Sequence, residues 1–423
     1  MNPTVAARPA VSRIRWIVCS LLFFATVIAY VDRGVLAYLE QTLEKIIGFD
    51  KQQYSYMTAA FQVAYAIGLV TAGRLTDRLG TRRGFAIAIT IWSVAAMLPG
   101  LATSVLTFSL AMFFLGLGEA ANFPACIKTV AEWFPKKERA LATGMFNSGA
   151  NIGAIVVPVV VPLLTFTFGW QGAFIATGAL GFLWLASWLL LYDKPETHPR
   201  ISPAELAYVR SDPPEKVASV PWLRILPLRE TWAFALAKFF TDPIWWFYLF
   251  WFAPYLQETF HLDIKQNRLP VILAYSLSCV GSIAGGWLSG SLLKRGLSLN
   301  VARKSALLVC ALAVLPVLYA PFSHNLWVVV GLVGLAMAAH QGWSANLFTL
   351  PSDLFPRAAV ASVVGFGGMV GSAGGVLMQL GAGRIVQATH SYLPLFLVAG
   401  SAYLVGLAVV QLLTPGLVPA SLD

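Results

Sequence analysis

The sequence predicts an all-α integral membrane protein with twelve transmembrane helices in two six-helix halves. Hydrophobic residues make up 58% of its 423 positions and charged residues only 11%, against about 25% charged residues in soluble proteins. The charges are bunched between apolar runs of about 20 residues or more, which is the length that a helix needs to cross a bilayer.

The apolar runs define the predicted helices in order. The first six spans are predicted at 14–38, 53–75, 84–104, 106–131, 139–165 and 171–192, and the last six at 231–256, 267–293, 301–321, 325–350, 357–384 and 391–413. The polar interval between Asp193 and Glu230 predicts a cytoplasmic linker with a short surface helix around 203–210. The predicted domains are therefore an N-terminal bundle (1–192), a linker (193–230) and a C-terminal bundle (231–423).

The two halves carry related motifs. Phe134-Pro135 is followed by Gly144, and Phe355-Pro356 is followed by Gly365. Each motif comes shortly after a carboxylate at the cytoplasmic end of a predicted helix. An even number of helices per unit keeps both units in the same orientation, which indicates a parallel repeat about an axis along the membrane normal.

The net charge of +10 is a topology signal. Basic residues gather in the N-terminal segment and in the loops after the second, fourth and eighth spans, whereas the loops on the other side hold few of them. By the positive-inside rule, both termini and the basic loops are predicted to be cytoplasmic. This distribution favours a bilayer, and not a nucleic acid, as the partner of the basic charge. The N-terminal segment has no signal-peptide cleavage site and is predicted to stay on the protein.

The sequence offers no pattern for a cofactor or a metal. Its cysteines lie within apolar spans and show no paired spacing, which predicts reduced, apolar packing residues: Cys19, Cys126, Cys279 and Cys310. No phosphate-binding glycine loop is present, so we expect no use of ATP.

Two charged residues stand inside the first span, in Tyr30-Val31-Asp32-Arg33. Placing such charges in the bilayer costs about 2.5 to 3.5 kcal/mol per residue on insertion scales unless they face a wet cavity or a partner. Their presence predicts a functional site, with a structural ion pair between helices as the alternative. The planar guanidinium of Arg33 matches a carboxylate, so it is the candidate anchor for an anionic substrate.

Further polar residues fall near the middle of other spans. Glu119 lies about 13 residues into the fourth span, Asp242 about 11 into the seventh and His340 about 15 into the tenth. Desolvation in an apolar helix favours the protonated form of Glu119, which makes it a candidate proton carrier, with a hydrogen-bonded helix contact as the alternative. Asp32 is the second candidate, unless it pairs with an arginine or with Lys128.

Other mid-span residues are candidate substrate contacts. The hydroxyls of Tyr30 and Tyr65 can bond sugar hydroxyls while their rings pack on sugar carbons. The remaining predicted contacts are Asn151, Trp245, His340, Gln341 and Asn346. A buried histidine is often structural, so His340 keeps both interpretations, and either Trp245 or Trp246 could face the cavity.

The loop from Gly73 to Arg83, GRLTDRLGTRR, resembles the signature loop of the major facilitator superfamily. Gly73 permits close helix approach, Asp77 can cap a helix or pair with an arginine, and Gly80 permits a tight turn. The resemblance implies a conformational latch formed by Gly73, Asp77, Arg78 and Gly80.

A closer resemblance covers nearly the whole chain. Tyr30-x-Asp32-Arg33, Gly118-Glu119-Ala120-Ala121-Asn122-Phe123-Pro124 and Glu132-Trp133-Phe134-Pro135 resemble the anion:cation symporter branch of that superfamily. The segments 238–246 and 339–346 are similar to those of hexuronate transporters. Position 112 is Met where sugar-acid relatives often have an arginine, and this favours a ring-form uronate over an aldonate.

The resemblance implies a proton-coupled importer of an organic anion, such as glucuronate or galacturonate, that works as a monomer in the bacterial inner membrane. Its partners would be the small anion, protons and the lipid bilayer. Uptake of another sugar acid or a dicarboxylate is the alternative within transport. A membrane enzyme or sensor is disfavoured, because the chain shows neither a nucleophile with its base nor an appended signalling domain.

Overall fold

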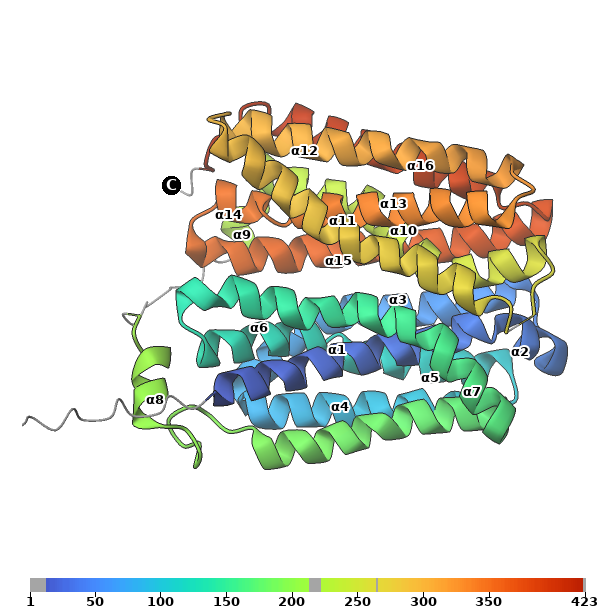
Figure 1. Cartoon of the computed structure of the whole chain (residues 1–423), viewed down its shortest axis with the longest axis horizontal. Helices are drawn as coiled ribbons and strands as arrows, with labels where there is room; N and C mark the ends of the chain where they lie inside the picture. The colour runs from blue at the N-terminus through green and yellow to red at the C-terminus, as the bar shows by residue number, and fades with distance from the viewer. Residues whose placement is uncertain (1–12, 213–221, 264, 421–423) are drawn as a thin grey trace, which may run out of the picture.

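The computed structural model describes residues 13–212, 222–263 and 265–420, without the side chains at 70, 72–77, 136, 137, 140, 222, 357, 358 and 361. The described chain is helical throughout its regular structure. Figure 1 shows two helical bundles lying against one another, with α1 to α7 in one and α10 to α16 in the other. Below, these are called the N-half and the C-half.

The N-half contains the six predicted spans and one short extra helix. Its elements are α1 (Ile14–Tyr38), α2 (Glu40–Ile47), α3 (Lys51–Leu79), α4 (Thr81–Met97), the 3-10 helix η1 (Leu98–Leu101), α5 (Val105–Glu119), α6 (Asn122–Trp133) and α7 (Lys136–Leu191). The starts of α3 and α5 are fixed by reciprocal caps, Asp50 with Gln53 and Ser104 with Thr107. Such capping boxes satisfy backbone N–H groups that a helix start leaves unpaired.

One long helical stretch, α7, accounts for both the fifth and the sixth predicted span. Gly169 interrupts it with φ 73° and ψ 175°, a conformation that glycine adopts without the steric cost of a Cβ. The sequence placed this break between residues 165 and 171, so the prediction of two spans is confirmed. The second segment packs beside α4.

The C-half repeats this order after the linker elements α8 (Pro203–Val209) and α9 (Trp222–Ile225). Its elements are α10 (Arg229–Thr259), α11 (Arg268–Lys294), α12 (Leu299–Val314), η2 (Leu315–Phe322), α13 (Leu326–Leu347), α14 (Leu350–Leu354), α15 (Arg357–Thr389) and α16 (Leu393–Leu413). The surface helix predicted around 203–210 is confirmed as α8. The domain limits at 192 and 230 stay a proposal; α7 ends at Leu191 and α10 begins at Arg229.

The prediction of a continuous helix for the fourth span was wrong in detail, because that span is broken between α5 and α6. The predicted tenth span, 325–350, agrees with α13 to within three residues, and the short helix α14 follows it after a similar break. A proline removes the N–H that would bond the carbonyl four residues earlier. Pro124 thus leaves the Ala120 carbonyl without its helical donor and Pro351 does the same to Leu347, so the breaks fall at equivalent places in both halves.

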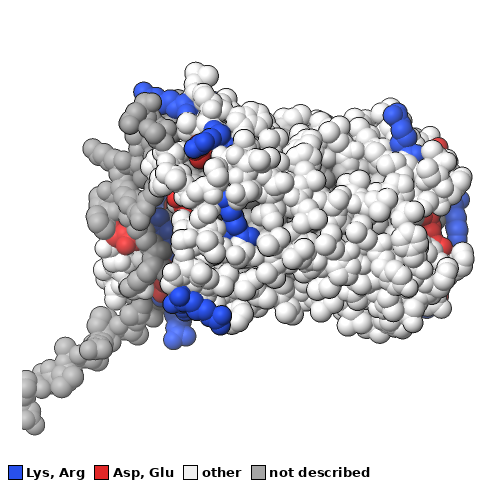
Figure 2. Space-filling view, turned by 90° about the horizontal axis from the view of Figure 1, so that it is seen from above, with Lys and Arg blue, Asp and Glu red and all other residues white. Residues whose placement is uncertain are grey.

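The surface agrees with a multi-pass membrane protein. Nine of the described helices are long and apolar enough to cross a bilayer, and one of them, Leu141–Leu191, spans 51 residues and contains the Gly169 break. Large apolar side chains are exposed on the flanks, for example Ile283 (76%) and Leu190 (81%). In Figure 2 the charged side chains lie mainly toward the two ends, which leaves a broad belt without them.

The linker is tied to the N-half. The backbone N–H groups of Ile14 and Arg15 donate to the carboxylate of Glu205 on α8, which is fully buried. The Arg15 side chain pairs with both Glu205 (3.0 Å) and Glu138 (3.1 Å). Glu205 therefore supplies the acceptors that the start of α1 lacks within its own helix.

The halves meet along three helix pairs: α3 with α15, α7 with α11, and α1 with α10. Small residues allow the backbones to approach. A Cβ on Gly375 of α15 would collide with the Gln62 side chain of α3, and one on Gly383 would collide with Ser55. These two glycines therefore permit close packing between the halves.

Two glycines of α11 give a matched test of close helix packing. A Cβ at Gly281 would overlap the backbone of Ala338 on α13, whereas one at Gly286 would meet nothing within 4 Å. We expect Gly281→Ala to destabilise the protein by about 1 to 3 kcal/mol through overpacking. Gly286→Ala should be neutral or stabilising by up to about 1 kcal/mol, because alanine favours a helix. Thermal unfolding in detergent measures both, and equal unfolding temperatures for the two variants would contradict the packing.

Candidate substrate and proton site

Arg33 lies at the centre of a cage of aromatic rings. Its guanidinium carbon is 4.7 Å from the ring centroid of Tyr30, 5.2 Å from Phe61, 4.9 Å from Tyr65 and 5.4 Å from Trp246. The residue is only 2% exposed. Ring faces attract a cation more strongly where water is excluded, so the cage stabilises the buried charge without neutralising it.

Glu119 supplies the counter-charge. Its Oε2 forms an ion pair with Arg33 Nε, and its Oε1 has no hydrogen-bond partner among the described residues. Glu119 is fully buried and is the last residue of α5. The C-terminal end of a helix carries negative partial charge, which disfavours a carboxylate there and makes the neighbouring arginine more important.

Asp32 is turned toward a different helix. It is 3% exposed and lies beside Thr177 on the second segment of α7. The Thr177 hydroxyl donates to the backbone of Phe174 instead, and neither Asp32 oxygen has a hydrogen-bond partner among the described residues. The two predicted proton carriers are thus neighbours in space with only one of them paired to Arg33.

Two cage residues were not among the predicted contacts. Phe61 looked like an ordinary apolar residue of α3, and Trp246 was named only as the alternative to Trp245 for the residue that faces the cavity. Trp246 packs against Tyr65 (5.6 Å between centroids) and comes from the C-half, so both halves build the cage. Phe61 and Tyr65 are four residues apart and therefore lie on the same face of the helix. This spacing is the sequence signal that could have identified Phe61 as a member of the cage.

Trp245 and His340 lie in the C-half as a stacked pair. Their rings are 5.2 Å apart and nearly parallel, at 12°. The Nδ1 atom of His340 is 2.6 Å from the hydroxyl of Tyr403, and His340 is 5% exposed. The stack holds Trp245 in place, and the tautomer of His340 decides which partner donates in the bond to Tyr403.

Asn151 and Gln341 lie together across the boundary between the halves. Asn151 Oδ1 on α7 accepts from Ser278 Oγ on α11 at 3.2 Å and from Gln341 Nε2 on α13 at 3.4 Å. These neutral groups can exchange partners with sugar hydroxyls at little cost, because a hydrogen bond is replaced by another of the same kind.

Asn346 occupies a different environment from the other candidates. Its amide donates to the carbonyls of Gly285 (2.9 Å) and Gly342 (2.8 Å), where α11 and α13 pack closely. It is 1% exposed. Its amide group is therefore engaged in a helix contact in this structure.

Lys238 and Asp242 form a second buried ion pair, at 2.6 Å on α10. The Lys238 ammonium also lies 4.4 Å from the ring centroid of Phe348. A Cβ on Gly371 of α15 would meet Asp242 at 2.5 Å, so the glycine makes room for the carboxylate. The two side chains therefore neutralise each other in this structure.

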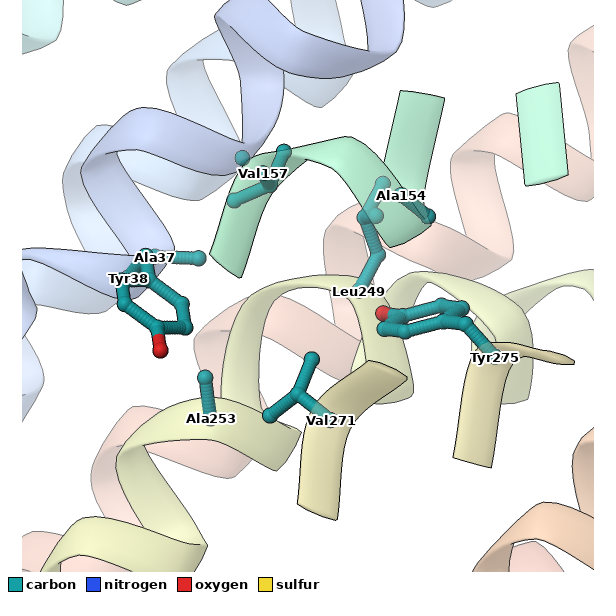
Figure 3. Close-up of a pocket in the computed structure, with 9 residues that line it drawn as sticks. Ala37, Tyr38, Ala154, Val157, Leu249, Ala253, Val271 and Tyr275 are labelled. Carbon is teal, nitrogen blue, oxygen red and sulfur yellow. The ribbon is translucent and has the colours of Figure 1, made fainter. Parts of the chain in front are cut away.

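A small pocket lies at the contact between the halves (Figure 3). It lies among α1, α7, α10 and α11, and its lining is almost wholly apolar: Gly34, Ala37, Tyr38, Ala154, Val157, Leu249, Ala253, Val271 and Tyr275. The Tyr275 hydroxyl donates to the Tyr248 carbonyl at 3.3 Å. Arg33 and the residues that surround it are not among the residues that line this pocket.

The predicted latch is described only in part. Gly73 and the side chain of Asp77 lie outside what the structure describes. Arg78 is exposed, and Gly80 separates α3 from α4 with φ 77° and ψ 157°. The turn chemistry expected of Gly80 is therefore present. Among the described residues, no group of three or more metal-binding side chains is placed to hold a metal ion.

Comparison with known proteins identifies the family. The sequence matches the Major Facilitator Superfamily over residues 22–379. It is 32% identical over 405 residues to the hexuronate transporter of Escherichia coli (strain K12), with 94% of this chain and 93% of that protein covered. The chain belongs to the major facilitator superfamily.

Other relatives agree. The chain is 28% identical over 397 residues to a probable galactarate/D-glucarate transporter of Bacillus subtilis (strain 168), covering 90% of this chain and 87% of that one. Among solved structures, a bacterial homolog of the human lysosomal transporter Spinster superposes with a TM-score of 0.73 at 15% identity over 96% of each chain. The predicted fold class and the resemblance to hexuronate transporters are confirmed, and the protein is a transporter and not an enzyme.

Asn346 and Gln341 allow packing and substrate roles to be separated. Asn346→Leu removes two donors from buried carbonyls, so we expect a loss of about 1 to 3 kcal/mol in stability. Gln341→Leu breaks one long hydrogen bond and should lower transport while the unfolding temperature stays near that of the parent. Thermal unfolding and uptake per folded molecule measure the two effects. If Asn346→Leu has the same stability as the parent, the packing role is wrong and Asn346 is again a candidate substrate contact.

Proposed function

We propose that the protein imports a hexuronate, such as glucuronate or galacturonate, together with protons across the bacterial inner membrane. Its relatives named hexuronate, galacturonate and galactarate/D-glucarate transporters support a sugar acid as the substrate class. The protein would work as a monomer by alternating access, with both termini in the cytoplasm.

One observation carries this proposal: a buried arginine that is paired with a glutamate inside a cage built from both halves. Arg33, Tyr30 and Glu119 belong to the N-half, and Trp246 belongs to the C-half. A substrate held there would contact both halves, as the binding site of a two-repeat transporter should. The rings of the cage suit the carbon face of a sugar.

Coupling follows from competition for Arg33. A substrate carboxylate and the Glu119 carboxylate both need the same guanidinium. When Glu119 takes up a proton, its negative charge disappears and Arg33 can pair with the substrate in a charge-assisted, bidentate geometry. Loss of that proton restores the Arg33–Glu119 pair and expels the substrate carboxylate.

Asp32 would carry a second proton. An ionised carboxylate without a partner is expensive in a buried place, so this residue favours the neutral form when access is closed. A monoanion moving inward works against about 2.3 kcal/mol per charge per 100 mV. One proton makes the step electroneutral, and a second makes it driven by the membrane potential.

The balance of charge among the described residues of the site favours a substrate with one carboxylate. Arg33 and Lys238 each already have an acidic partner, Glu119 and Asp242. Position 112 holds a methionine that is 1% exposed, where some relatives would offer an arginine. An aldarate with two carboxylates would leave one of them without a counter-charge, which is costly in a desolvated site. A uronate has only one.

Arg33→Lys tests the anchor. Lysine keeps the charge but loses the planar fork that matches a carboxylate, so we expect uronate transport to fall at least about tenfold. Counterflow of labelled glucuronate and galacturonate in proteoliposomes, with glucarate and galactonate for comparison, measures both transport and selectivity. Arg200→Lys, at an exposed site on the linker, is the matched control. Normal counterflow in well-folded Arg33→Lys protein would remove Arg33 from the binding site.

Glu119→Gln tests proton coupling. Glutamine mimics the protonated acid at every pH, so substrate binding and exchange should persist. Accumulation driven by a pH gradient should be lost, because the variant cannot release a proton inside. Both activities are measured in the same vesicles, with Asp32→Asn in parallel. Accumulation that keeps its full dependence on the pH gradient would exclude Glu119 from the proton path.

A further inference from the structure

A compact charge cluster lies at the end of the molecule where α2 is labelled in Figure 1, opposite the end that carries α8. It consists of Glu40 and Glu44 on α2, Lys51 at the start of α3, Glu258 near the end of α10 and Tyr392 just before α16. We call it the Lys51 cluster. None of its residues takes part in the site around Arg33.

Lys51 holds three carboxylates at once. Its Nζ lies 2.6 Å from Glu40 Oε1, 2.9 Å from Glu44 Oε2 and 2.7 Å from Glu258 Oε1. An ammonium group has three hydrogens, so each carboxylate receives one. The other oxygen of Glu258 accepts from the Tyr392 hydroxyl at 2.6 Å.

The cluster joins the two halves. Glu40, Glu44 and Lys51 belong to the N-half, while Glu258 and Tyr392 belong to the C-half. Nearby, the Lys51 backbone N–H donates to Gln387 on α15 at 3.1 Å, and the Tyr54 hydroxyl donates to the Phe250 carbonyl at 2.7 Å. Separation of the halves at this end must break the Lys51–Glu258 pair.

The charges do not balance. One ammonium faces three carboxylates, which leaves two negative charges in excess when all are ionised. Glu40 is fully buried, and its Oε2 has no hydrogen-bond partner among the described residues. The side chains of Glu44 and Glu258 are 36% and 31% exposed, so they connect the cluster to solvent.

We propose that the Lys51 cluster is an outer gate that binds a proton at Glu40, and that proton uptake from outside closes the gate. With Glu40 ionised, the N-half part of the cluster carries one net negative charge and faces the negative charge of Glu258. With Glu40 protonated, that part is neutral and Lys51 is shared by fewer carboxylates, which strengthens its bond to Glu258. The proposal takes the membrane orientation from the proposed function.

The direction of the pH effect follows from where Glu40 is buried. In the closed structure, desolvation raises the pKa of Glu40 to about 7, Lys51 opposes that rise, and Glu44 and Glu258 add to it. Tyr54 and Tyr392 are the other titratable groups that face it. Opening hydrates Glu40 and removes Glu258, so the pKa falls toward the ordinary range. The closed form thus binds the proton more tightly, is favoured at acidic pH, and loses this advantage as the pH rises through about 7.

Distances across the outer end test the proposal without relying on transport. Thr103 and His324 are exposed in outer loops of the N-half and the C-half. Spin labels on Thr103→Cys and His324→Cys, with the four native cysteines replaced by alanine, report the separation by double electron–electron resonance in nanodiscs. From about pH 8.5 to about pH 5.5 the ratio of short to long distances should rise by about tenfold or more.

Three variants test the role of individual carboxylates in the proposed gate. Glu40→Gln should give the short distance at both pH values, and Glu258→Gln should enlarge the long-distance population at both. Asp50→Asn changes a carboxylate at the same end that only caps α3, a role that asparagine also fills, so its pH response should equal that of the parent. If Glu40→Gln fails to fold, the pH dependence of the distances in the parent and the distances in Glu258→Gln still test the gate.

A parent protein with distances independent of pH, or a Glu40→Gln variant with the full pH response, would overturn the gate. Counterflow of uronate in the same preparation separates this outcome from failure of the proposed function. Counterflow with pH-independent distances rejects the gate alone. A pH-dependent distance without uronate counterflow rejects the proposed substrate and leaves the gate standing.

Discussion

The positive charge of Arg33 has to be balanced at every stage of a transport cycle. Leaving one member of a buried ion pair without its partner costs about 3 to 5 kcal/mol. In this structure Glu119 is the partner, and four aromatic rings exclude water around the pair. In the proposed mechanism, exchange of one carboxylate for another lets the substrate enter without leaving Arg33 unpaired, and it would link substrate binding to the charge state of Glu119.

The backbone places Glu119 at a helix end, where its charge has a strong effect on this exchange of carboxylates. Pro124 ends α5 early, so Glu119 lies at a helix C-terminus and not within a continuous helix. The C-half has the same interruption before Pro351, although no acidic residue occupies the last turn of α13 there. Both halves thus contain a similar break, and among the described residues only the N-half places an acidic residue at it.

Two places in the protein have more acidic than basic side chains around one buried cation. Arg33 has two acidic neighbours, Glu119 and Asp32, and Lys51 has three at the end of the molecule where α2 lies. In the proposed mechanism, a proton reduces the excess of negative charge in both places and strengthens a bond to the substrate or between the halves. Separate residues would then couple protons to the substrate site and to the gate.

The sequence alone predicted the helical membrane fold, the order of the spans, and the place of Arg33, Glu119 and His340 along their helices. Hydropathy and helical rise are local properties, so they can be read without neighbours. Only the tertiary structure decided which way these side chains turn. It placed Trp246 and not Trp245 beside Arg33, used Asn346 for packing, and joined Lys51 to Glu258 across the halves. Rotation of each helix about its axis is set by packing against other helices, and sequence spacing within one helix does not contain that information.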